Sequence, residues 1–197
     1  MPDDFFALLG EPRRPFLDPE RIKDTFHRLS RTEHPDQQAG TDIDEAGASF
    51  AKLNQAQAVL RDPKSRLRHL LELEHPEVRL SGPANVPATL ANLFAPIHEL
   101  LRQADELLAK KVAAPSALAK ALLARQEWTL REQAETRLAE VEALQSAAEG
   151  ELRVLDASWE TGARDNSAAT LHDFYQRFAY LGRWAEQLRE RLFHLGL

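Results

Sequence analysis

Apolar residues recur every three or four positions along most of the chain, a spacing that predicts amphipathic helices. No stretch alternates apolar and polar residues with a period of two over a useful length, so we expect no sheet. The expected helices cover residues 3–9, 19–33, 43–61, 63–73, 96–111, 115–159 (with Gly150 as a point of interruption) and 168–194.

The boundaries of the first helices carry residues typical of caps. Asp18 and Asp62 each precede a proline, and an aspartate N-cap followed by proline at the first helical position is a strong helix start. Gly10 should end the first helix, because glycine readily adopts the backbone conformation of a C-cap. The N-terminal part should therefore hold four helices, with the second and third paired as an antiparallel hairpin.

Prolines and a glycine gather between residues 74 and 87, which is typical of a linker. We therefore expect an all-α protein with a four-helix N-terminal domain and an antiparallel helical bundle at the C-terminus. The expected bounds are 1–73 for the first domain, 74–95 for the linker and 96–197 for the bundle.

The tripeptide His34-Pro35-Asp36 lies in the connection of the expected hairpin. Pro35 disfavours helix at His34, so the preceding helix should stop there and leave the tripeptide in an exposed polar loop. Taken alone, such a tripeptide is simply a turn. Held between two packed helices, it can instead present a hydrogen-bond donor and an anion at a fixed spacing.

The helix before this tripeptide is the most basic one of the chain. Ile22, Phe26 and Leu29 form its apolar stripe, and four cationic residues lie mostly off that stripe. These cations are Arg21, Lys23, Arg28 and Arg31. They form either an ordinary solvated face or a surface for an acidic partner.

The composition narrows the classes of function. A net charge of −6 and a pI near 5.7 argue against a general nucleic-acid or anionic-membrane partner. The chain has no Cys, which excludes disulfides, thiolate zinc sites and a Cys nucleophile. The N-terminus does not read as a targeting peptide and no apolar run is long enough to span a bilayer, so we expect a cytoplasmic protein.

An enzyme is a further class to consider. His34 with Asp36, or the scattered histidines, could in principle form a metal site or an acid–base pair. No pair of histidines follows the H-E-x-x-H pattern of a helical metal site. We therefore expect no catalytic residue, no metal and no cofactor.

Taken together, the four helices, the basic second helix and the tripeptide at the end of a hairpin resemble a J-domain. Within it, three segments are similar to the J-domain of the HscB family, the co-chaperones of iron–sulfur cluster assembly. They are Leu53-Asn54-Gln55-Ala56, Leu60-Arg61-Asp62-Pro63 and Leu67-Arg68-His69-Leu70-Leu71. Two further segments, Leu130-Arg131-Glu132 and Ala185-Glu186-Gln187-Leu188, resemble the C-terminal three-helix domain of that family.

The resemblance implies a co-chaperone without catalytic activity of its own. His34, Pro35 and Asp36 would contact a DnaK/HscA-type chaperone and trigger its ATP hydrolysis. Arg21, Lys23, Arg28 and Arg31 would dock on an acidic surface of that chaperone.

The resemblance also implies that the C-terminal domain holds an IscU-like scaffold protein through an apolar patch. The corresponding residues here are Leu123, Ala124, Arg125, Trp128 and Glu132, with Tyr180 on the last helix and Phe178 as its alternative. The aromatic members could equally be core residues. Ala124, Arg125 and Thr129 replace larger apolar, Met-like and acidic members of the family, which leaves a different client, unrelated to iron–sulfur assembly, as the alternative.

Overall fold

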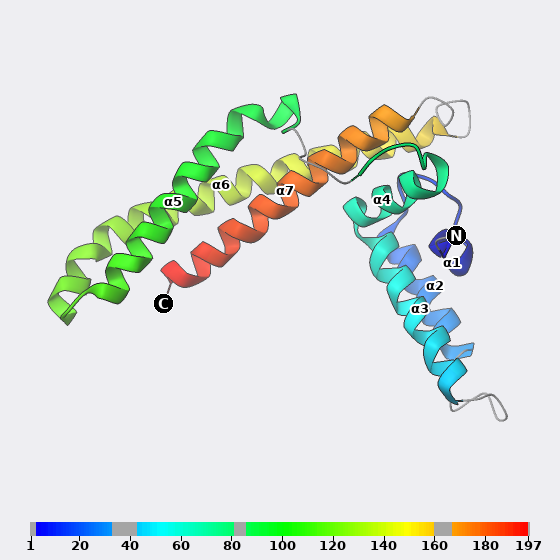
Figure 1. Cartoon of the computed structure of the whole chain (residues 1–197), viewed down its shortest axis with the longest axis horizontal. Coiled ribbons are helices and arrows are strands. Elements are labelled where there is room, and N and C mark those ends of the chain that lie inside the picture. The colour runs from blue at the N-terminus through cyan, green and yellow to red at the C-terminus, as the bar shows by residue number, and fades with distance from the viewer. Residues whose placement is uncertain (1–2, 33–42, 81–85, 160–166, 197) are drawn as a thin grey trace. The chain divides into compact units, whose positions relative to one another are not determined.

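The computed structural model describes residues 3–32, 43–80, 86–159 and 167–196; for residues 32 and 43–46 it describes only the backbone. The described part is all-α and contains no strand (Figure 1), as the sequence predicts. The helices are α1 (Phe5–Leu9), α2 (Pro19–Thr32), α3 (Ile43–Arg61), α4 (Pro63–Glu74), the short 3-10 helix η2 (Ala88–Leu90), α5 (Ala91–Ala113), α6 (Ala117–Ala157) and α7 (Ala168–Leu195).

The caps expected from the sequence form the helix ends. Gly10 adopts a left-handed conformation, with φ of 66°, and ends α1. At the start of α4, a side-chain oxygen of Asp62 accepts a hydrogen bond from the Ser65 N–H at 2.8 Å. Asp18 accepts one from the Glu20 N–H at 3.0 Å, so both aspartates satisfy amide donors that the first helical turn leaves free.

The first four helices enclose one core. Figure 1 shows α2 and α3 side by side along their length, with α4 across one end of the pair. Rings of Phe26 and Phe50 lie 6.4 Å apart between the two long helices. The side chains that are fully buried here include Phe6, Ile22, Leu53, Ala56, Leu60, Leu67, Leu70 and Leu71. This packing fixes α2 and α3 as an antiparallel hairpin.

Most helices begin and end within two residues of the expected positions, but α5 and α6 each differ from the expectation in one respect. α5 begins at Ala91 rather than at Pro96, which lies inside the helix. The earlier start buries Leu93 against the core, and this burial compensates for the backbone hydrogen bond that proline cannot donate. α6 continues through Gly150 without a break, since one glycine costs a helix only about 1 kcal/mol.

Helices α5, α6 and α7 pack around a second core. Trp184 of α7 is its largest fully buried side chain, with 1% of its surface exposed. Its other members include Leu93, Ile97, Leu101, Leu107, Leu130, Val141, Leu181 and Leu188. The C-terminal part is therefore a bundle of three long helices, as expected.

The chain forms two compact units, and neither is a continuous stretch of sequence. One unit holds residues 1–82 and 149–175, and the other holds 83–148 and 176–197. The end of α6, the start of α7 and the first four helices thus share a unit. The division into domains at residues 73 and 96 stays a prediction about folding and function.

Within the first unit, the end of α6 contacts the segment between α1 and α2. The indole Nε1 of Trp159 donates to the carbonyl oxygen of Arg13 at 3.0 Å, and the side chain is 3% exposed. The guanidinium of Arg153 lies over the ring of Phe16, 4.6 Å from its centroid. These contacts join residues that lie far apart in sequence.

In the described parts of the chain, no helix combines the length and the apolar character needed to cross a membrane.

Candidate protein-binding surfaces

The basic residues of α2 lie on the side of the helix away from the core. Arg21, Arg28 and Arg31 are exposed, while Ile22 and Phe26 are buried. The spacing of the three arginines places them within one broad solvent-facing arc of the helix. The structure therefore provides a cationic helix face of the kind that the sequence predicts.

Among the described residues, Arg21 and Lys23 of the predicted cations have carboxylate partners. Arg21 Nε donates to Oε1 of Glu11 at 3.1 Å, and the Glu11 carboxylate is buried while the arginine stays exposed. Lys23 Nζ lies 3.2 Å from Glu20 on the same helix. The Arg21 contact holds one guanidinium in place, because the buried carboxylate cannot move freely.

The predicted tripeptide His34-Pro35-Asp36 lies outside the described residues. Its flanks are described: α2 ends at Thr32 and α3 begins at Ile43, and these two helices pack side by side. The role of the tripeptide in chaperone binding stays a prediction.

The predicted scaffold patch divides into exposed and buried residues. Trp128 on α6 is 65% exposed, and Ala124 and Glu132 are exposed as well. Leu123 is only half-buried but packs against the core of the second unit. Of the predicted patch on α6, the exposed side chains are therefore Ala124, Arg125, Trp128 and Glu132.

On α7, the two alternative aromatics differ in exposure. Phe178 is 5% exposed and belongs to the protein interior. Tyr180 is half-buried, and its ring lies 5.6 Å from that of Trp184. Of the two, Tyr180 is the one that reaches the surface.

Sequence reasoning missed three exposed apolar side chains. Val112 on α5, and Leu118 and Leu122 on α6, are 86%, 73% and 76% exposed. The apolar spacing of α6 suggested that both leucines face a core. A signal was present: the sequence around them contains Lys and Arg but no Asp or Glu.

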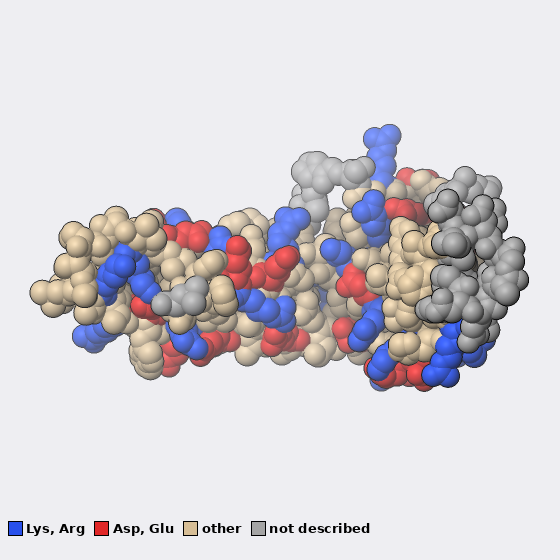
Figure 2. Space-filling model, turned by 90° about the horizontal axis from the view of Figure 1, so that it is seen from below, with Lys and Arg blue, Asp and Glu red and all other residues tan. Residues whose placement is uncertain are grey.

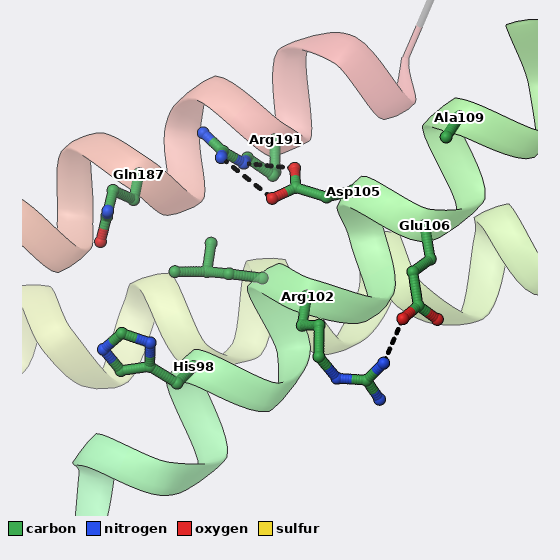
Figure 3. Close-up of a pocket in the computed structure, with 8 residues that line it drawn as sticks. His98, Arg102, Asp105, Glu106, Ala109, Gln187 and Arg191 are labelled. Carbon is green, nitrogen blue, oxygen red and sulfur yellow. Dashed lines mark hydrogen bonds and ion pairs between the residues drawn. The ribbon is translucent and has the colours of Figure 1, made fainter.

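A groove between α5 and α7 has a volume of about 510 Å³, and half of its lining residues are charged. Figure 3 shows Asp105 and Arg191 pointing toward one another across it, joined by contacts of 3.0 and 3.2 Å. Arg102 pairs with Glu99 and Glu106 along α5, and hydrogen bonds from Arg102 and Gln103 lower the pKa of Glu99 to about 2. The ion pairs Arg102–Glu106 and Asp105–Arg191 thus join the charged side chains that line the groove.

No cluster of three His, Asp or Glu side chains within the described ranges is arranged to hold a metal ion.

A part of the first unit matches a known protein family. Residues 4–69 match the family described as the DnaJ domain. The four helices, the hairpin and the cationic face of α2 thus belong to a J-domain, matched over residues 4–69.

Relatives with similar J-domains include two kinds of chaperone protein. Over 74 residues the chain is 38% identical to the "Co-chaperone protein HscB" of Proteus mirabilis, which covers 36% of this chain and 43% of that protein. Over 63 residues it is 40% identical to the "Chaperone protein DnaJ 2" of Thermus thermophilus, covering 32% of this chain and 21% of that protein. The chain matches less than half the length of each.

The fold of the whole chain is similar to that of HscB. The crystal structure of human co-chaperone protein HscB matches with a TM-score of 0.50 and 16% identity, covering 96% of this chain and 82% of that one. The similarity to HscB-type J-domain co-chaperones, predicted from the sequence, is thereby confirmed. The J-domain sequence and the fold of the whole chain both support it.

Proposed function

We propose that the protein stimulates ATP hydrolysis by a DnaK/HscA-type chaperone and delivers an iron–sulfur cluster scaffold protein to it. The observation that carries the proposal is a J-domain, with a cationic α2 face leading to His34-Pro35-Asp36, in a chain whose whole fold is similar to HscB. The protein acts as an adaptor, and the chemistry takes place in the chaperone.

The cationic face of α2 supplies the first contact. Arg21, Arg28 and Arg31 are exposed, so an acidic chaperone surface attracts them at long range and raises the association rate. Because salt screens charges over about 8 Å at physiological ionic strength, this contribution falls as salt is added.

The tripeptide supplies the trigger. In the bound state Asp36 pairs with a basic group of the chaperone, and such a pair gains strength when the interface excludes water. His34 contributes a donor beside it, and Pro35 holds the spacing between the two. The loop acts at the chaperone, at its ATPase and linker region.

The second unit holds the scaffold. Trp128 is a large exposed aromatic side chain, the residue type that most often contributes binding energy at interfaces. Ala124 and Glu132 flank it on α6, and Tyr180 on α7 is the aromatic that reaches the surface.

A different client is the second candidate. The exposed part of α6 carries Arg125 and Thr129 in place of the Met-like and acidic members expected from the HscB resemblance. A changed surface charge favours a partner of changed charge. In this alternative the J-domain function is kept and the client is unrelated to iron–sulfur assembly.

Single-turnover ATP hydrolysis by the cognate DnaK/HscA-type chaperone tests the proposal. The assay compares the chaperone alone, with this protein, and with this protein plus an IscU-like scaffold. His34→Gln should abolish the stimulation. His98→Gln, which changes an exposed histidine on α5, is the matched control and should leave the stimulation intact.

The outcomes separate the two candidates. Stimulation that the scaffold enhances supports the iron–sulfur adaptor. Stimulation that the scaffold leaves unchanged supports the different client. Absence of stimulation by any resident DnaK/HscA-type chaperone overturns both.

A further inference from the structure

The end of the second unit where α5 meets α6 has an unusual charge. Residues 107–126 contain Lys110, Lys111, Lys120 and Arg125 but no Asp or Glu, in a chain whose net charge is −6. Figure 2 shows this end, at the left, as a mainly tan surface with blue side chains among it. It is a cationic and apolar region of an acidic protein.

A groove opens at this end between three helices. It has a volume of about 330 Å³ and is lined by Leu108, Lys111, Val112, Lys120 and His194. The lining side chains come from the end of α5, the start of α6 and the end of α7. Its apolar members and its cations therefore lie side by side, where one ligand can contact both.

Large apolar side chains stand exposed around the groove. Val112 is 86% exposed, while Leu118 and Leu122, one helical turn apart on α6, are 73% and 76% exposed. Burying side chains of this size gains about 1.5–3 kcal/mol each. A row of such side chains exposed to solvent is therefore a surface whose burial by a partner protein would be favourable in free energy.

The cations here are largely available for a partner. Lys111 Nζ is held by Glu127 at 2.5 Å, and both side chains are mostly buried, so this pair ties α5 to α6. Lys110, Lys120 and Arg125 are exposed, and none has an ion pair with a carboxylate of the described residues. Lys110, Lys120 and Arg125 thus give this region a net positive charge among the described residues.

We propose that this end of the α5–α6 hairpin is a docking surface for an acidic amphipathic helix of a partner protein. Leu118 and Leu122 pack against the apolar face of that helix, and carboxylates along its edge pair with Lys120 and Arg125. A protein helix fits better than a lipid surface, because its side chains can fill the groove beside Val112.

This surface goes beyond the proposed scaffold patch. It lies at the start of α6, and none of its apolar residues belongs to the predicted scaffold patch, with which it shares only Arg125. The proposal therefore does not depend on whether the acidic partner is an iron–sulfur scaffold or another protein. Its test needs neither the chaperone nor the scaffold.

The test uses the full chain and two designed probe peptides. Both are fluorescein-labelled helices of about 18 residues, or five turns, with leucines along one face. One carries Glu along both edges of that face, and the other carries Lys at the same positions. Fluorescence anisotropy should show the Glu peptide binding at least about tenfold more tightly than the Lys peptide, with the difference reduced by salt.

Two pairs of variants locate the site. Lys120→Glu and Leu122→Ser should each weaken binding of the Glu peptide by about tenfold, a free-energy loss of about 1.4 kcal/mol. Lys64→Glu changes an exposed lysine on α4, and Val154→Ser changes an apolar residue of α6 that is 74% exposed. Both controls should bind like the unchanged chain.

Three results would overturn the proposal. They are absence of binding by the Glu peptide, equal binding of both peptides, and equal effects of the site and control variants. Co-sedimentation with phosphatidylcholine vesicles containing phosphatidylglycerol is a separate arm. If Lys120→Glu and Leu122→Ser reduce vesicle binding while the Glu peptide fails to bind, the surface serves lipid instead.

Discussion

Arg14 and Asp156 form an ion pair across 142 positions of sequence, with Nη2 of the arginine 2.7 Å from Oδ2 of the aspartate. Oδ1 of Asp156 also accepts hydrogen bonds from Arg14 Nε at 2.9 Å and from the Phe16 N–H at 3.1 Å. A single carboxylate, 8% exposed, thus joins the end of α6 to the segment between α1 and α2. The first unit depends on a residue far beyond the J-domain itself.

Asp156→Asn should destabilise the first unit by about 2–3 kcal/mol, because it removes the carboxylate charge that pairs with the half-buried guanidinium of Arg14. Urea denaturation followed by circular dichroism measures the loss. Asp173→Asn, at an exposed position of α7 in the same unit, is the control and should change stability by less than about 0.5 kcal/mol. Equal midpoints for the two variants would contradict the role of Asp156.

Substitutions of Phe178 and Trp128, two aromatic residues of the predicted scaffold patch, should affect different properties of the protein. Phe178→Ala should cost about 3–5 kcal/mol of stability, because it opens a cavity at a residue that is 5% exposed. Trp128→Ser should leave the thermal midpoint nearly unchanged, because that side chain is 65% exposed. Thermal unfolding of each variant, followed by titration with an IscU-like scaffold, measures both properties.

Under the proposed function, Trp128→Ser weakens scaffold binding in that titration while the stimulation of the chaperone by the J-domain alone persists. Scaffold binding that survives Trp128→Ser at full strength would remove the α6 patch from the proposal.

His69 should make the J-domain less stable at mildly acidic pH. Burial lowers the pKa of His69 below its usual value near 6.5, and its Nε2 accepts a hydrogen bond from the Phe5 N–H at 3.1 Å. The unfolded chain therefore binds a proton more readily than the folded one. Stability is full above about pH 6.5 and falls as the pH drops through that value toward the lower folded pKa.

Urea midpoints between pH 5 and 7.5 test this linkage. His69→Gln keeps an acceptor for the Phe5 N–H but cannot titrate, so it should flatten the pH dependence. His172→Gln, at a half-buried position of α7, should retain the slope of the unchanged chain. A slope that persists in His69→Gln would assign the dependence to another group.

Arg66 should be essential to the packing of α4. It is 2% exposed, and it donates to the carbonyl oxygens of Pro15 at 2.8 Å and Leu60 at 2.6 Å. Burial lowers the pKa of Arg66 to about 10, so it remains charged at neutral pH. Arg66→Met should destabilise the J-domain by about 3 kcal/mol, because two buried carbonyls lose their donor.

Differential scanning calorimetry compares Arg66→Met with Arg68→Met, which changes an exposed arginine of the same helix. The Arg68 variant should lose only the weak surface pair with Glu72, within about 0.5 kcal/mol. Similar melting temperatures for the two variants would show that water molecules donate hydrogen bonds to the two carbonyls in place of Arg66.

Local signals made the first helices predictable. Asp18, Asp62 and Gly10 act through hydrogen bonds and backbone angles within a few residues of themselves, so a short sequence window contains the whole cause. The hairpin followed from the apolar stripes of α2 and α3. The cationic face of α2 is visible in sequence for the same reason, because its residues share one helix.

Features that depend on distant partners were not predictable in this way. Pro96 suggested a helix start, but burial of Leu93 against the other helices decided the boundary. Leu118 and Leu122 have the spacing of core residues, yet both side chains are exposed. Nothing near Asp156 indicates that its partner is Arg14.

The discontinuous units set an order of events during synthesis. α6 and α7 each contribute residues to both units, so neither unit is complete when its first segment leaves the ribosome. Arg14 and Phe16 are synthesised early, but Asp156 is synthesised only after most of the second unit. The contacts of Arg14 and Phe16 with Asp156 therefore form late. The nascent J-domain thus passes through a stage in which its contacts to α6 are unmade and its surface there is open to other factors.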